Sequence, residues 1–231
     1  MLKWLVGIGG DEFTLESLPK NFIHPNLKII EVDGHYYLSS QEFEEKDDSE
    51  NIREIASKNI SLLNAINKLQ NPTSNSVSLT GVVRHEDEDG KITYSVQKSL
   101  KIMWNVRGVD ILGSSNETDA ASPIKSRWAN VAFKNEKIWW ALSLLNSSNL
   151  TWDILYKIFE IIESEFGSEI YNFKGISKKE VDRFSRTYNS SQALGDKSRH
   201  PGKDHLPPKN PMIFKEANDL IRILLSQRLS Q

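Results

Sequence analysis

The spacing of apolar residues changes once along this chain, and that change most limits the folds open to it. Up to about residue 112, short apolar runs are separated by turn signals, as is typical of strands. From about residue 132, apolar residues recur at spacings of three and four, as is typical of helices. The sequence therefore predicts an α+β fold: an N-terminal mixed sheet-and-helix unit over 1–120, then a C-terminal helical bundle over 121–231.

The N-terminal unit is expected to contain two hairpins. Asp33-Gly34 joins the runs 27–32 and 35–39, and Asp-Gly is favoured there because both turn residues need positive φ. The acidic segment "EDEDG" resembles a second hairpin turn and precedes a run that starts at 91. Beyond 27–32 and 35–39, strands are predicted over 3–8, 77–85, 91–106 and 109–112, with one amphipathic helix over 42–69. No motif assigns this unit a role.

The C-terminal unit carries several helix start and stop signals. Thr151 is an expected N-cap and Gly167 an expected C-cap of one helix. Ser177 and Glu180 form a capping-box pattern at the start of another. Pro211 suits the first turn of the last helix. Helices are predicted over 132–146, 151–167, 177–190 and 210–229, and the composition of 113–123 predicts a loop or linker.

Composition excludes several classes of function. The net charge is −2, so no global field directs the chain to nucleic acid or to a membrane. There is no cysteine, which excludes disulfides, thiolate metal sites and thiol nucleophiles and fits a reducing compartment. No apolar stretch approaches the roughly 20 residues that span a bilayer, and the N-terminus does not resemble a signal peptide. A cytoplasmic protein with no membrane partner is expected.

The segment "GDKSRHPGKDH" over 195–205 is the strongest candidate for a functional site. It contains two of the five histidines, one arginine, two lysines and two aspartates. It lies in a basic region, since residues 174–209 carry nine Lys or Arg against four Asp or Glu. A reaction site, an anion-binding loop and a solvated connection are all compatible with such a composition.

The residues around that segment resemble a known family. In this region a helix is expected to end near an Asn. A Gly, the pair Arg199-His200 and a "P-M…E-A" start of the last helix follow in that order. This arrangement resembles the C-terminal helical region of many uncharacterised bacterial proteins. Some of those domains look like the HEPN superfamily of small helical bundles, which includes metal-independent RNases and toxins. The resemblance covers residues 150–230. The motif associated with HEPN RNases, an Arg and a His separated by four to six residues, is matched by Arg199 and His205.

The resemblance implies a dimeric, nucleic-acid-directed protein and a candidate RNase of a bacterial defence or toxin system, with RNA as its substrate and no metal or cofactor. A histidine can transfer protons near neutral pH, and an arginine can stabilise phosphate oxygens. The candidate catalytic residues are Arg199, His200 and His205, and the candidate nucleic-acid-binding residues are Arg183, Arg186, Lys197 and Lys203.

Two alternatives stay open at this point. Arg199-His200 could instead fix a helix junction through hydrogen bonds to carbonyls or to a carboxylate. The whole protein could be a non-enzymatic interaction or accessory subunit whose bundle mediates assembly. Adjacent Trp139 and Trp140 cannot both face one core from a helix, so they predict an interface, in a homodimer or with a protein partner.

Two further motifs have simpler interpretations. "GIGGDE" over 7–12 lacks the spacing of a phosphate-binding loop and contains two acidic residues, so it predicts a strand end and a turn. His85 stands beside an acidic segment and is expected at a solvated hairpin tip rather than in a cation site.

Overall fold

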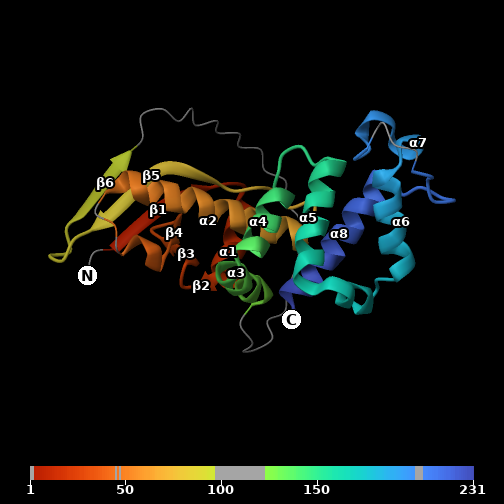
Figure 1. Cartoon of the computed structure of the whole chain (residues 1–231). Helices are drawn as coiled ribbons and strands as arrows, with labels where there is room; N and C mark the ends of the chain where they lie inside the picture. Colours follow the sequence, from red (N-terminus) through yellow and green to blue (C-terminus); the bar gives the residue numbers. More distant parts are fainter. Residues whose placement is uncertain (1–2, 45, 47, 97–122, 201–204) are drawn as a thin grey trace. The chain divides into compact units, whose positions relative to one another are not determined.

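The computed structural model describes residues 3–44, 46, 48–96, 123–200 and 205–231 (Figure 1). Several sequence predictions fall outside these residues: the strand over 97–106, the strand over 109–112, most of the 113–123 linker, the unit boundary at 120–121, and Lys203. They stay predictions.

The α+β fold class is confirmed. The chain divides into two compact units, one formed by Met1–Ile60 with Asn75–Arg127 and the other by Ser61–Ser74 with Trp128–Gln231. The first unit holds an antiparallel sheet with helices, and the second is helical (Figure 1). Among the described residues, no helix is long and apolar enough to cross a membrane.

The sheet of the first unit has six strands within the described part of the chain, in the order β2-β3-β4-β1-β5-β6. The neighbouring strands in this order are all paired antiparallel. Asp33 and Gly34 have φ of 52° and 75°, so the predicted Asp-Gly hairpin is confirmed. In the second hairpin, the Asp87 carboxylate accepts N–H bonds from Asp89 and Lys91, and Gly90 has φ of 79°. The strands are β1 (Lys3–Gly9), β2 (Ile23–His24), β3 (Leu27–Val32), β4 (His35–Ser39), β5 (Ser78–Glu86) and β6 (Ile92–Val96).

Two glycines, one within the first strand and one just after it, serve close packing. A Cβ on Gly7 would lie 2.3 Å from Thr80 Oγ1, and one on Gly10 would lie 2.9 Å from Val77 Cγ1. Since β1 pairs with β5, these glycines let the two backbones approach. The segment is a strand end, as predicted, but the expected turn is wrong, because Asp11 caps a helix that begins at Glu12.

Helix α1 (Glu12–Asn21) was not predicted from the sequence. It is capped by Asp11, whose carboxylate accepts the Thr14 N–H at 2.9 Å. Burial acts to raise the pKa of Asp11, but hydrogen bonds from Thr14 and Asn75 outweigh it and lower that pKa. Asp11 therefore stays ionised as a cap.

Helix α2 (Ser49–Gln70) begins later than the predicted residue 42. The Asp48 carboxylate accepts the N–H groups of Glu50 and Asn51, at 2.8 and 2.9 Å, and so supplies the cap. The preceding turn η1 (Gln41–Phe43) belongs to a separate short segment. The cap at Asp48 therefore sets the start of α2 at Ser49.

The second unit confirms most predicted caps. Thr151 caps α5 and Gly167 ends it, while Ser177 and Glu180 form the expected capping box of α6. Figure 1 shows α5, α6 and α8 lying side by side. The remaining elements are α3 (Ile124–Lys134), α4 (Glu136–Leu145), α5 (Trp152–Phe166), η2 (Gly167–Asn172), α6 (Lys178–Asn189), α7 (Ser191–Leu194), η3 (Gly195–Lys197) and α8 (Phe214–Leu229).

Two helix predictions in this unit were wrong in their bounds. The segment 132–146 contains a break, because the Asn135 side chain accepts the Ile138 N–H at 3.2 Å and starts a new helix there. The last helix begins at Phe214 rather than at 210. Met212 N–H donates instead to Thr187 Oγ1 at 3.0 Å, and the Glu216 carboxylate accepts the Ile213 N–H at 2.9 Å.

Candidate functional site

An aromatic cluster between α5 and α6 supports the candidate site. Phe184 is fully buried, with its ring centroid 5.9 Å from that of Tyr156 and 5.4 Å from that of Phe159. The rings of Tyr156 and Tyr188 are 4.6 Å apart, and Trp152 stacks near both Phe184 and Tyr188. Aromatic contacts of this kind fix the position of α6 against α5.

Tyr188 also has a polar contact to α5. Its hydroxyl donates a hydrogen bond to the Asp153 carboxylate. Burial, reinforced by that bond and by the charge of Asp153, raises the pKa of Tyr188 well above its ordinary value. The phenol therefore stays protonated at neutral pH and acts as a fixed donor rather than as a proton-transfer group.

The segment between α7 and His200 is held by Arg199. Gly195, with φ of 58°, ends α7. The Arg199 N–H donates to the Tyr188 carbonyl at 2.9 Å. Its Nη2 lies 3.0 Å from Glu160 Oε1, and its guanidinium carbon lies 4.9 Å from the centre of the Tyr156 ring. Arg199 is thus joined to both α5 and α6.

Beside Arg199, an open cavity of about 360 Å³ brings two histidines together. The ring centroids of His200 and His205 are 5.9 Å apart, with an interplanar angle of 45°. Arg186 lies in the same wall and donates to the Pro207 carbonyl at 3.2 Å. The described residues that line the cavity are Ser185, Arg186, Asn189, His200, His205 and Leu206.

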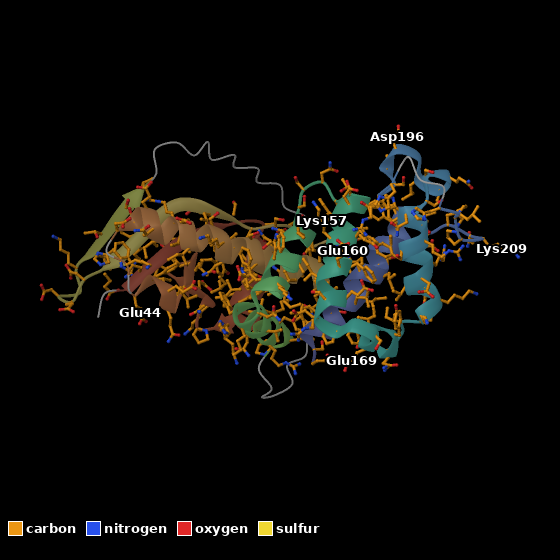
Figure 2. The ribbon with its side chains drawn as sticks, in the orientation of Figure 1. Glu44, Lys157, Glu160, Glu169, Asp196 and Lys209 are labelled. Atoms are coloured by element: carbon orange, nitrogen blue, oxygen red, sulfur yellow. The ribbon has the colours of Figure 1, made fainter. Side chains whose placement is uncertain are left out.

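Among the residues predicted from the sequence, the others that the structure describes lie outside that lining. Arg183 extends toward the start of α8, donating to the Asn210 carbonyl at 2.7 Å and pairing with Glu216 at 2.7 Å. Lys197 is exposed on η3. The catalytic role expected of Arg199 stays a prediction, and its guanidinium is paired with Glu160 in this structure. Figure 2 labels Glu160, which belongs to α5, and Asp196, which belongs to η3.

Sequence reasoning did not identify several residues of the site. Ser185 and Asn189 are one turn apart on α6, next to Arg186, so a helical projection around Arg186 would have found them. Tyr156 and Glu160 are also one turn apart, on α5. Nothing local connects that pair to Arg199, because their proximity depends on how α5 and α6 pack.

The site can transfer protons and bind an anion. Two imidazoles, a guanidinium, an amide and a hydroxyl surround one open volume. Within the described residues, no group of three or more His, Cys, Asp or Glu is placed to hold a metal ion.

In comparisons with known proteins, no family model, no curated protein and no solved structure matches this chain.

Proposed function

We propose that this protein is an RNA-directed protein of the cytoplasm with a HEPN-like helical domain. It cleaves RNA without a metal ion and serves a bacterial defence or toxin system. The observation that carries the proposal is the cavity in which His200, His205 and Arg186 meet. Two proton-transfer groups and one cation are the side chains that phosphodiester transfer needs.

In the proposed reaction, the 2′-hydroxyl of one nucleotide attacks the adjacent phosphorus. A neutral imidazole accepts the 2′-hydroxyl proton as the new P–O bond forms. A protonated imidazole donates its proton to the 5′-oxygen as the old P–O bond breaks. The products are a 2′,3′-cyclic phosphate and a 5′-hydroxyl, and the next turnover requires only that the two histidines exchange protons with water.

The two histidines and Arg186 suit these steps for separate reasons. Histidine changes charge between pH 5 and 8, so one imidazole can be neutral while the other is protonated. The 5.9 Å between the ring centroids leaves one ring for the attacking oxygen and one for the leaving oxygen. The planar guanidinium of Arg186 can stabilise the non-bridging oxygens as their charge increases.

The test is RNA cleavage by the full chain in the presence of EDTA. A 5′-labelled single-stranded RNA of mixed sequence should yield fragments that end in a cyclic phosphate. The same RNA with one 2′-deoxynucleotide should resist cleavage at that position only, because the attacking hydroxyl is missing. Wild-type protein that is inert on single-stranded and double-stranded RNA, alone and with any co-purified partner, would reject the proposal.

A second candidate is a non-enzymatic accessory subunit, which the side chain of Trp140 favours. It is 56% exposed on α4, whereas Trp139 is half-buried. A large exposed apolar side chain on the helical unit suits a protein interface. The Arg199–Glu160 ion pair also suits a structural role for that segment.

Assembly through the helical unit is measured by sedimentation. We expect the wild-type chain to form a homodimer at micromolar concentration, or to be recovered with a protein partner. Trp140→Ser should weaken that assembly, because it removes apolar contact area. Phe13→Ser, at a residue that is 75% exposed in the first unit, is the control and should leave the measured mass unchanged. A monomeric wild-type chain with no partner would contradict the expectation.

A further inference from the structure

We infer that Glu160 and Tyr156 of α5 are positioning residues that fix His200 by holding Arg199. The inference rests on the proposed function of the His200–His205 cavity. It assigns Arg199 to the support of the site, whereas the sequence predicts that Arg199 contacts the phosphate.

Three contacts to three different groups fix Arg199. Its backbone N–H is bonded to the Tyr188 carbonyl of α6 at 2.9 Å. Its guanidinium is bonded to Glu160 at 3.0 Å and lies over the Tyr156 ring at 4.9 Å. One contact sets the backbone and two set the side chain, so the residue is restrained in both.

His200 is the next residue in the chain, and consecutive Cα atoms are about 3.8 Å apart. A shift of the backbone at Arg199 therefore also shifts the backbone that carries the His200 ring. The rings of His200 and His205 lie 5.9 Å apart across the cavity, so such a movement changes the distance on which proton transfer depends. Arg199 itself is not among the described residues that line the cavity.

The exposure of the Arg199–Glu160 ion pair indicates that the pair fixes a position rather than adds stability. The side chains of Arg199 and Glu160 are 41% and 44% exposed, so the pair is screened by water and contributes little to overall stability. The Glu160 carboxylate and the Tyr156 ring together fix the position of the Arg199 guanidinium instead. Removing Glu160 should therefore change the site more than it changes the melting temperature.

A masking role for Glu160 predicts the opposite result. If the carboxylate withheld Arg199 from phosphate, Glu160→Gln would release the guanidinium and speed cleavage. If Glu160 positions His200 through Arg199, the same substitution slows cleavage. The sign of one measured change therefore separates the two roles.

The experiment compares steady-state RNA cleavage by Glu160→Gln with that by Glu163→Gln. The control removes the same charge from an exposed residue of the same helix. We expect Glu160→Gln to lower kcat by about tenfold to a hundredfold with little change in KM, as misplacement of a reacting group does. Glu163→Gln should match the wild type. In an Arg199→Ala background, Glu160→Gln should cause no further loss. A higher kcat in Glu160→Gln would overturn the inference. So would a fall in kcat that is as large in the Arg199→Ala background as in the wild type.

A second measurement keeps the inference testable if the protein does not cleave RNA. The ring signals of His200, assigned by comparison with His200→Ala, are followed by ¹H–¹³C NMR. Glu160→Gln should shift them and should leave those of His35, in β4, in place. Inert wild-type protein whose His200 signals shift in Glu160→Gln would reject the proposed function and retain the support of His200 by Glu160. Unshifted His200 signals would reject that support.

Discussion

Replacing His200 with alanine is expected to lower RNA cleavage by about a hundredfold or more, since general acid–base groups contribute that much. The melting temperature should change little, because His200 lies half-buried on a loop segment outside the helices. Cleavage and melting are measured on the same preparations. His205→Ala should show the same loss, because the reaction needs a proton acceptor and a proton donor.

The control is His35→Ala, which removes an exposed imidazole from β4. It should cleave RNA at the wild-type rate. If the wild-type protein does not cleave RNA and His200→Ala melts well below it, the segment is a structural junction. The accessory-subunit function then becomes the better account of the chain.

Replacing Phe184 with alanine should destabilise the helical unit by about 3–5 kcal/mol, the usual cost of deleting a buried phenylalanine. Phe184 is fully buried and contacts rings from Trp152, Tyr156 and Phe159. The lost ring leaves a cavity between α5 and α6 that this cluster of large side chains cannot close. Urea unfolding followed by circular dichroism measures the loss.

The matched substitution is Phe13→Ala, where the side chain is 75% exposed. It should change stability by less than about 1 kcal/mol, since surface substitutions rarely do more. Equal effects at the two positions would show that the aromatic cluster does not hold α5 and α6 together.

Turns and caps were predictable because each depends on a few neighbouring residues. Asp33-Gly34, Thr151 and the Ser177–Glu180 box all act within one turn of chain, and the structure confirms each. The break at Asn135 was missed since Ala132 and Ile138 continue the apolar periodicity on either side of it.

Helix α1 was missed for a different physical reason. Only Thr14 and Leu18 are buried in it, so its apolar periodicity is weak, and Pro19 argues against a helix interior. In the candidate site, the sequence indicated the histidines and Arg186. It could not indicate Glu160, because the contact with Arg199 exists only once α5 and α6 have packed.

The cavity is lined entirely by side chains between Ser185 and Leu206, as far as the described residues define it. The chain around it is tied back to α6 itself, through the Tyr188 carbonyl at Arg199 and the Thr187 hydroxyl at Met212. Ser185, Arg186 and Asn189 lie on α6 beside Phe184 and Tyr188, so the same stretch of chain lines the cavity and packs α6 against α5. A substitution in this stretch can therefore change the cavity directly or through the packing of α6, and a loss of cleavage is assigned to the cavity only where the melting temperature is kept.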